Sequence, residues 1–271
     1  MRNIAHRGFS GKYPENTMLA FEKAIELNVD MIELDITLSK DKIPVVIHDD
    51  TLERTTNGKG KVKNTLFNKL KMLDAGSWMH RKYLDEKIPS LEEVLALIKQ
   101  SKVHLNIEIK SSAFEKKLSD SSIEVQTIRL IKKYKLFHQI VISSFEPKIL
   151  LRLRKLSAKI KLSLLIEPYS KNSKFDPISF VKKIHAVSLN MHKSQVKSNF
   201  FKKAIEEKIP ILIYTVNTKK EMQKMKELGI QGIFTNYPDK LTGIIPILSL
   251  CFDLDIFGLI FCLRFYYLLD R

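Results

Sequence analysis

The sequence predicts one α/β domain with the (β/α)8 TIM-barrel fold. Its 271 residues are a length that a single barrel of this kind commonly uses. Short runs of β-branched and apolar residues alternate with longer segments of helical periodicity, which indicates repeated βα units around a parallel sheet. Eight such runs match the strand number of a closed barrel. An open doubly wound sheet is the alternative, but the sequence has no G-x-G-x-x-G turn to support it.

The expected elements follow one another along the whole chain. Strands are predicted over residues 3–6, 31–38, 104–109, 139–143, 161–166, 186–190, 210–216 and 232–235. Helices are predicted over residues 17–27, 90–99, 119–135, 147–156, 177–183, 197–207 and 219–228, with an eighth after Asp239. Several helices begin at a recognisable signal, such as Ser90 with Glu93 three residues later, which can form a capping box.

One connection is much longer than the others. Residues 49–89 separate the second strand from the next helix, whereas a βα connection usually takes about 2 to 6 residues. Insertions of this length are often functional lids, and this one holds Trp78, the only tryptophan. We therefore assign residues 1–243 to a barrel domain with a small insertion at about 49–89, and residues 244–271 to an apolar C-terminal segment.

Composition limits the partners of the protein. The formal net charge is +16, but the lysines are spread along the chain without an Arg-rich run or interleaved aromatic residues. This pattern argues against a nucleic-acid partner and fits a phosphorylated substrate or an anionic membrane surface. The two cysteines, Cys251 and Cys262, build neither a disulfide framework nor a cysteine metal site, which favours a reducing compartment. Because the N-terminus lacks the apolar core of a signal peptide, we expect a cytoplasmic protein.

The C-terminal segment 244–271 is almost wholly apolar, but Asp253 and Asp255 divide it. In a membrane each aspartate would cost about 3 kcal/mol, against a gain of about 0.5 kcal/mol for each Leu, Ile or Phe. Membrane insertion would therefore be nearly neutral in free energy. We expect the first part to complete the last barrel helix and the rest to pack on the barrel. A weak membrane association through 244–271 is the alternative.

Two acidic residues interrupt an otherwise apolar predicted strand, "MIELDITLS". Because strand side chains alternate between the two faces, Glu33 and Asp35 point to the same side. Neighbouring carboxylates resist burial unless a cation neutralises them, and Mg²⁺ and Ca²⁺ both take oxygen ligands. Glu108, in "HLNIEIK", would supply a third carboxylate to the same ion, with Lys110 on the same face. The sequence therefore predicts a site for one divalent cation.

Further polar residues follow the first strand and a second strand-like segment. His6 and Arg7 come at the end of the first predicted strand, Glu15 follows them, and His48 ends the apolar run of "IPVVIHDD". In a barrel the carboxyl ends of the strands face the active site. Two histidines suit a general acid and base, and an arginine fork suits phosphate oxygens. With the cation, these residues predict cleavage of a phosphate ester.

Seven segments of the sequence together resemble the glycerophosphodiester phosphodiesterase family. They occur in the family's order between about residue 3 and about residue 239, and they read "HRGFSGKYPENTMLAFEKAI", "DMIELDITLSKDKIPVVIHDDTLERTTNGKG", "IPSLEEVL", "LNIEIK", "ISSF", "YTVN" and "GIFTNYPD". The resemblance implies a metal-dependent TIM barrel that hydrolyses glycerophosphodiesters to sn-glycerol 3-phosphate and an alcohol. A lysophospholipase D-type enzyme acting on lysophospholipids at a membrane is the alternative. A binding barrel without catalysis is a third hypothesis, which the intact histidines and carboxylates argue against.

The resemblance also implies roles for the residues at the family's catalytic and metal positions. By position, His6 and His48 look like the general acid and base. The residues that look like the metal ligands are Glu33, Asp35 and Glu108.

The same resemblance implies which residues bind the substrate. Arg7 looks like the phosphate contact, with Lys110 alongside the metal position. Glu15 matches an acidic residue that the family places next to the metal. The insertion at 49–89 looks like the small cap that covers the substrate in this family.

Three positions depart from the family's usual pattern. Asn28 stands where a glycine is common, and asparagine is well able to keep a positive φ. Tyr214 replaces a frequent tryptophan and keeps an aromatic wall for the substrate. Asn236 replaces a frequent aspartate after the last strand. We expect none of the three to touch the metal ligands or the two histidines, so that they affect substrate preference rather than activity.

Overall fold

The structure, a computed structural model, describes residues 1–168 and 175–242. Its strands are β1 (Arg2–His6), β2 (Met31–Leu38), β3 (Pro44–Val46), β4 (His104–Ile109), β5 (Ile140–Ser144), β6 (Lys161–Ile166), β7 (Ser188–His192), β8 (Ile211–Tyr214) and β9 (Gly232–Thr235). Its α-helices are α1 (Met18–Glu26), α2 (Phe67–Met72), α3 (Leu91–Ile98), α4 (Ile123–Tyr134), α5 (Pro147–Leu156), α6 (Pro177–Lys183), α7 (Asn199–Glu206), α8 (Lys219–Glu227) and α9 (Asp239–Thr242). Short 3₁₀ helices are η1 (Val62–Asn64), η2 (Arg81–Tyr83), η3 (Ser111–Ala113) and η4 (Lys193–Gln195).

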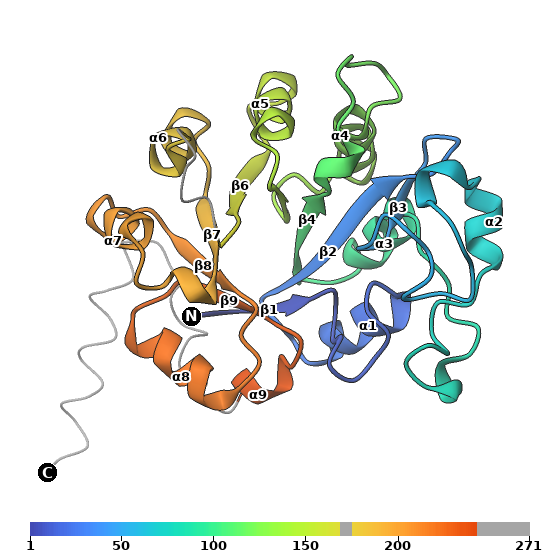
Figure 1. The fold of residues 1–271 in the computed structure, drawn as a ribbon, viewed down its shortest axis with the longest axis horizontal. Coiled ribbons are helices and arrows are strands. Elements are labelled where there is room, and N and C mark those ends of the chain that lie inside the picture. The colour runs from blue at the N-terminus through green and yellow to red at the C-terminus, as the bar shows by residue number, and fades with distance from the viewer. Residues whose placement is uncertain (169–174, 243–271) are drawn as a thin grey trace, which may run out of the picture.

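Within the described residues, the eight predicted strands run parallel and close into a barrel that helices surround (Figure 1). The order around the barrel is β1-β9-β8-β7-β6-β5-β4-β2, and the ring closes because β1 also pairs with β2. The short strand β3 pairs antiparallel with the end of β2 and lies outside the ring. The predicted (β/α)8 barrel is therefore confirmed.

Most element boundaries lie close to those predicted from the sequence, and the larger differences have local causes. Helix α4 begins at Ile123 because Ser122 is its N-cap and the Ser119 N–H donates to the Ser122 hydroxyl at 2.9 Å. Such side-chain bonds compete with helical ones. Strand β7 begins at Ser188 because the Ala186 N–H still donates to the last turn of α6. Asn28 has φ 51°, as predicted.

The barrel interior has an apolar layer at one end and polar side chains at the other. The apolar layer contains Ile4, Met31, Val141, Leu212 and Phe234. Because strand side chains return to the same face every second residue, the next inward positions along these strands lie towards their carboxyl ends. Those positions include His6 after Ile4 and Glu33 after Met31. The alternating strand pattern thus places the predicted polar residues on top of an apolar floor.

A much larger core lies between the strands and the surrounding helices. On β2 the outward residues Ile32, Leu34 and Ile36 belong to this core, which also holds Leu95 of α3, and all four are 0% exposed. Every residue of β2 is buried. The inward residues of this strand, Glu33 and Asp35, are therefore enclosed on both sides and cannot be a solvated edge.

The insertion at 49–89 forms a small unit with its own core beside α1 and α3 (Figure 1). Leu52, Val62, Leu70, Ala75 and Ile88 of the insertion form this core together with Val45 of β3 and Ile47. The Tyr83 hydroxyl donates to the carbonyl of Lys12 at 2.6 Å, and the Tyr83 ring lies 5.9 Å from that of Tyr13. The insertion is thereby attached to the loop that follows β1, next to the open end of the barrel.

Candidate active site

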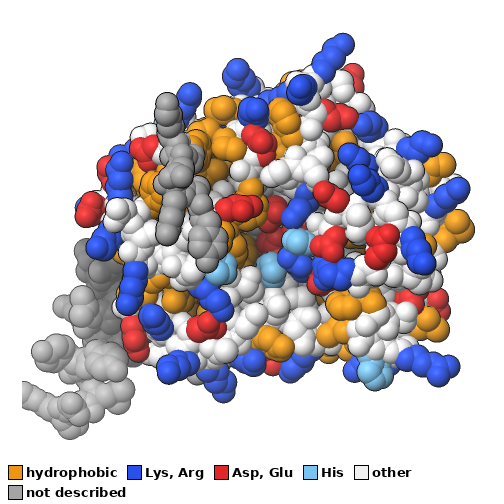
Figure 2. Space-filling view, viewed as in Figure 1, with side chains coloured by type: hydrophobic (Ala, Val, Ile, Leu, Met, Phe, Trp, Pro, Cys, Tyr) orange, Lys and Arg blue, Asp and Glu red, His pale blue; other side chains and the backbone are white. Residues whose placement is uncertain are grey.

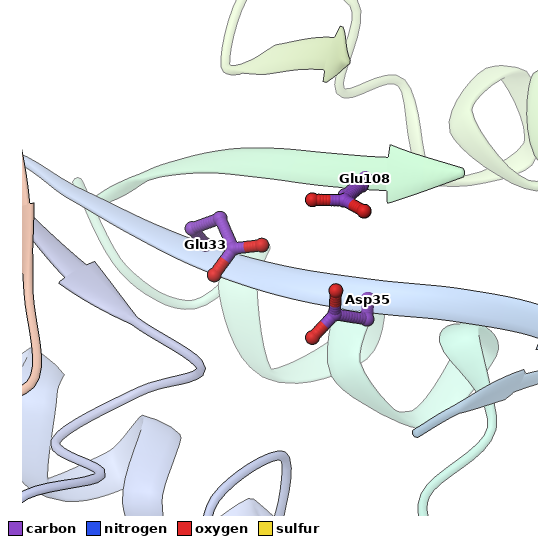
Figure 3. A group of neighbouring side chains, drawn as sticks. All are labelled: Glu33, Asp35 and Glu108. Atoms are coloured by element: carbon purple, nitrogen blue, oxygen red, sulfur yellow. The ribbon is translucent and has the colours of Figure 1, made fainter. Parts of the chain in front are cut away.

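Three carboxylates from the adjacent strands β2 and β4 converge inside the carboxyl end of the barrel (Figure 3). Glu33 and Asp35 project from β2, and Asp35 lies directly opposite Glu108 in the pairing of β2 with β4. One oxygen of each carboxylate lies within 4.8 Å of the others, and all three residues are buried. The sequence prediction that these side chains share one face is thus confirmed.

Burial and mutual repulsion oppose full ionisation of these three groups. Burial, with the charges of Asp35 and Glu108, raises the pKa of Glu33 well above its usual value. Burial and Asp35 raise the pKa of Glu108 to about 7. Burial would also raise the pKa of Asp35, but nearby cations, Arg7 first among them, lower it. A divalent cation would remove the repulsion, and carboxylate oxygens are ligands that Mg²⁺ and Ca²⁺ accept, so the trio fits such an ion.

A tight turn after β1 holds Arg7 against this trio. Gly8 has φ 79°, and a Cβ there would lie 2.7 Å from a backbone carbon of α1, so only glycine fits. The Arg7 N–H donates to Glu33 Oε2 at 2.9 Å. Its guanidinium donates to Glu15 at 2.8 Å, and its Nε lies 3.3 Å from Asp35 Oδ2. The turn therefore brings one fixed cation to the edge of the carboxylates.

Lys110 supplies a second cation, next to Glu108 and the other carboxylate oxygen of Asp35. It follows β4 directly, and its Nζ lies 3.3 Å from Glu108 Oε1 and 3.8 Å from Asp35 Oδ1. Glu108 and Asp35 hold the pKa of Lys110 above its usual value although burial opposes this. The amine therefore stays charged beside the trio.

His6, at the end of β1, faces the trio with one ring nitrogen and Asn236 with the other. Its Nε2 lies 4.0 Å from Glu33 Oε2, and its Nδ1 lies 2.7 Å from Asn236 Oδ1. Since an amide oxygen only accepts, Nδ1 carries the proton and the Nε2 lone pair faces the cavity. Burial and the charge of Arg7 lower the pKa of His6 to about 4, so its imidazole is neutral near pH 7.

The expectation that Asn236 does not touch the histidines is wrong. Barrel closure places the end of β9 beside the end of β1, and the Asn236 amide therefore meets His6. Two backbone bonds fix the residue: its N–H donates to Asn217 Oδ1 at 2.9 Å, and its carbonyl accepts from the Gly11 N–H at 2.7 Å. Asn236, one of the three positions at which the resemblance expects another residue, is thus the hydrogen-bond partner of His6.

His48 follows β3 and has a carboxylate as its partner. Its Nδ1 lies 2.6 Å from Asp49 Oδ1, and no residue in the described part of the chain bonds to its Nε2. Arg54 donates to Asp49 at 2.6 Å and to Glu15 at 2.7 Å. Glu15 accepts from Arg7 as well, so it lies between two arginines and does not join the carboxylate trio. Burial lowers the pKa of His48, although Asp35 opposes this shift.

A cavity of about 250 Å³ lies next to several of these groups. Figure 2 shows it as the hollow at the centre of one face, with acidic side chains inside and histidines at its rim. Its lining residues are His6, Arg7, Glu33, His48, Asn106, Glu108, Phe145, Leu165, His192, Tyr214, Thr215 and Phe234. Residues of β1, β2 and β4 with His48 make one side polar, whereas mostly apolar and aromatic residues of β5 to β9 form the opposite wall.

Tyr214 lies at the centre of this apolar wall. Its hydroxyl donates to the carbonyl of Ile166 at 2.7 Å, so its ring rather than its proton faces the cavity. The rings of Phe145, His192 and Phe234 lie 6.0, 5.7 and 6.5 Å from it. The predicted aromatic wall is present and involves more residues than the sequence indicated.

Arg54 and His192 are two of the side chains at this site that sequence reasoning missed. Arg54 lies within a segment that resembles the family and follows Asp49 by five positions, but only the fold brings it to Glu15. Strand β7 ends at His192, two residues later than predicted. A strand end predicted at His192 would have placed this side chain at the carboxyl end of the barrel.

Among the described residues, no helix has both the length and the apolar character needed to cross a bilayer. Cys251, Cys262 and the segment 244–271 lie outside the described residues. The expectations for them, including packing on the barrel and membrane association, stay predictions.

Comparisons with known proteins agree with the motifs. The model of the glycerophosphoryl diester phosphodiesterase family matches residues 6–240. A glycerophosphodiester phosphodiesterase of Caldanaerobacter subterraneus is 36% identical over 242 residues, which cover 89% of this chain and 96% of that protein. One of Bacillus altitudinis is 36% identical over 244 residues, with the same coverage of 89% and 96%.

Solved structures agree as well. A phosphodiesterase of Oleispira antarctica, in complex with the product sn-glycerol-3-phosphate, has a TM-score of 0.79 and 28% identity. The match covers 90% of this chain and 96% of that one. The chain therefore belongs to the glycerophosphoryl diester phosphodiesterase family, and it is an enzyme of the phosphoric diester hydrolase class.

Proposed function

We propose that this protein hydrolyses glycerophosphodiesters to sn-glycerol 3-phosphate and an alcohol, with one divalent cation as its cofactor. The observation that carries the proposal is the buried trio of Glu33, Asp35 and Glu108 beside a cavity that the imidazoles of His6 and His48 also line. A buried carboxylate cluster fits a cation, and a cation with flanking basic groups fits a phosphate diester. The product bound in the Oleispira antarctica relative supports this substrate class.

The cation would be held by Glu33, Asp35 and Glu108. When bound, it supplies positive charge that offsets the charge developing on the phosphate oxygens. Both Mg²⁺ and Ca²⁺ take carboxylate oxygens, and the assay described below compares them. The raised pKa of Glu33, caused by burial and its acidic neighbours, is what a site built around a cation would have in the cation's absence.

Arg7 and Lys110 would bind the phosphate and keep it at the polar side of the cavity. Arg7 lines the cavity, and Glu15 and Asp35 restrain its guanidinium there. A planar guanidinium matches two phosphate oxygens, whereas the Lys110 amine adds a point charge. The ring of Tyr214 would contact the carbon atoms of the substrate on the opposite wall.

His6 and His48 would move the protons. In each ring Nδ1 donates to a neighbouring oxygen, of Asn236 for His6 and of Asp49 for His48. Each Nε2 is therefore free to act in the cavity. One imidazole, neutral, would take the proton of the nucleophile at its Nε2, while the other, protonated at both nitrogens, would give its Nε2 proton to the oxygen of the leaving alcohol, which is general acid and base catalysis.

Chelation tests the proposal directly. We expect dialysis against a chelator to abolish release of sn-glycerol 3-phosphate from glycerophosphocholine, and added Mg²⁺ or Ca²⁺ to restore it. Glu33→Gln and His6→Ala should stay inactive at any metal concentration. The first removes a charged metal ligand without changing the side-chain volume much, and the second removes an imidazole that transfers a proton. The exposed positions Glu206 and His138 provide the matched controls Glu206→Gln and His138→Ala, which should keep full activity.

Two results would contradict this proposal. Activity that does not change on chelation would show that the reaction needs no divalent cation. Turnover retained by Glu33→Gln or His6→Ala would show that the substituted residue is not needed for the reaction. Circular dichroism melting of each variant checks that a loss of activity is not a loss of fold.

A further inference from the structure

A third histidine lines the cavity, on the wall opposite the carboxylates. His192 is the last residue of β7 and is half-buried. Its ring lies 5.7 Å from the ring of Tyr214 at an interplanar angle of 65°, which is an edge-to-face contact. Neither the proton transfers nor the proposed metal site uses this residue, although it reaches the same cavity.

The residues that follow β7 fix the orientation of the His192 ring. Its Nδ1 accepts from the Ser194 N–H at 3.2 Å and lies 2.8 Å from the Ser194 hydroxyl. The N–H of His192 donates to Gln195 Oε1 at 3.1 Å, and Gln195 in turn donates to the carbonyl of Glu167. The turn η4 therefore holds both the backbone and the ring in place.

These contacts also decide which ring nitrogen carries the proton. A backbone N–H can only donate, so Nδ1 must be the acceptor and, in a neutral ring, Nε2 carries the hydrogen. Burial, together with the charge of Lys193, lowers the pKa of His192, which keeps the ring neutral near pH 7. No described residue accepts a hydrogen bond from Nε2. His192 thus offers the cavity one oriented hydrogen-bond donor.

Two of the other polar side chains that line the cavity are already engaged. The Tyr214 hydroxyl donates to Ile166, and the Asn106 amide donates to Ser143 Oγ at 2.9 Å. Phe145, Leu165 and Phe234 are apolar. A donor on a largely apolar wall fixes the position of an oxygen atom in a ligand whose other atoms are carbon.

We propose that the Nε2–H of His192 donates a hydrogen bond to a hydroxyl oxygen of the glycerol unit of the substrate, and that His192 thereby helps the enzyme select glycerol esters. The proposal rests on the function proposed above. With the phosphate held at the polar side by Arg7 and Lys110, the attached carbon chain must extend across the apolar wall. A cavity of about 250 Å³ is small beside those that hold larger ligands, so it suits a three-carbon unit with the alcohol group directed outwards.

Two substitutions at this position separate the donor from the packing. His192→Phe keeps a ring against Tyr214 but has no donor, whereas His192→Gln places an amide N–H near the position of Nε2. We expect His192→Phe to raise KM for glycerophosphocholine about 3- to 10-fold with little change in kcat, as one neutral hydrogen bond would. His192→Gln should recover part of this loss. Melting temperatures show whether both variants fold.

Substrate analogues identify the atom that His192 contacts. The choline phosphodiesters of propane-1,2-diol and propane-1,3-diol each lack one of the two glycerol hydroxyls. For one of them we expect wild type and His192→Phe to have equal KM, because the contacted oxygen is already missing. For the other, the difference between the two proteins should persist.

Several results would overturn the inference. One is an unchanged KM for glycerophosphocholine in His192→Phe, and another is an equal loss on both diol analogues. A loss that differs between glycerophosphocholine and glycerophosphoethanolamine would place the contact at the alcohol group instead. These outcomes all require that wild type hydrolyses glycerophosphocholine. Absence of that activity would instead contradict the proposed function.

Discussion

At the scale of single residues, the two proposed catalytic histidines differ in their partners. His6 donates from Nδ1 to the amide of Asn236, whereas His48 donates to the carboxylate of Asp49. An amide orients an imidazole without adding charge, and a carboxylate also stabilises its protonated form. Asn236 therefore acts as a positioning residue, which fixes the ring of His6 and the nitrogen that faces the cavity.

This role of Asn236 predicts the behaviour of two variants. Asn236→Ala should lower kcat/KM about 10-fold, because the ring of His6 loses the hydrogen bond that orients it. Asn236→Asp should keep most of the activity, since its carboxylate still accepts from Nδ1, and should raise the pKa of His6 above that in wild type. Steady-state kinetics across pH on all three proteins test this.

A purely structural role of Asn236 would give a different pattern. Both variants would then lose melting temperature together, and the pH dependence of kcat/KM would be the same in Asn236→Asp and wild type. Recovery of activity by the aspartate is the result that only the positioning role produces.

At the scale of elements, the insertion is joined to the barrel through charges as well as apolar packing. Arg54 binds Asp49 and Glu15, and Glu15 binds Arg7 of the turn after β1. The segment that carries His48 is therefore linked to the segment that carries His6. This link explains why the two imidazoles, which come from separate connections, face one cavity.

The link through Arg54 predicts a pH dependence of stability. Hydrogen bonds from Arg54 lower the pKa of Asp49, and with those from Arg7 they lower the pKa of Glu15 although burial opposes this. A carboxyl whose pKa is lower in the folded state stabilises the protein above its ordinary pKa, and the stabilisation is lost as pH falls. Arg54→Gln should therefore be less stable than wild type at pH 7. This difference should shrink from about pH 5 to about pH 3.

Urea unfolding at several pH values measures this difference. Arg129→Gln is the matched control, because Arg129 pairs with the exposed Asp120 and neither residue belongs to the insertion. A stability difference between Arg54→Gln and wild type that stays constant down to pH 3 would show that the two carboxylates do not depend on Arg54.

At the scale of the whole molecule, stability comes mainly from the core between barrel and helices. Helix α3 contributes four buried apolar residues to it, among them Leu95, which is 0% exposed. Packing in such a core is dense, so a deleted side chain leaves a cavity. The polar site, by contrast, lies inside the barrel and does not interrupt this core.

A pair of leucine substitutions tests whether stability comes mainly from the core between the barrel and the helices. Leu95→Ala should lower the free energy of unfolding by about 2–5 kcal/mol, through lost burial and an unfilled cavity. Leu156→Ala, at the end of α5 where the side chain is 41% exposed, should change it by no more than about 0.5 kcal/mol. Urea denaturation gives both values, and equal losses would contradict the assignment of the core.

The sequence allowed much of the fold and half of the site to be predicted. Alternation along one strand predicted that Glu33 and Asp35 share a face, and capping residues predicted helix starts such as that of α3 at Ser90. Both are local patterns, in which neighbours along the chain decide the outcome. Boundaries that depend on tertiary pairing, such as the start of β7, differ from the predicted ones.

By itself the sequence determined the family, the barrel and the residues with acidic, basic or imidazole groups at the ends of its strands. Only the tertiary structure decided which side chains meet. Asn236 reaches His6 across 230 positions because β9 pairs with β1, and His192 faces the trio because β7 lies across the ring from β2. Closure of a barrel joins distant segments, and no local periodicity records which of their side chains will be in contact.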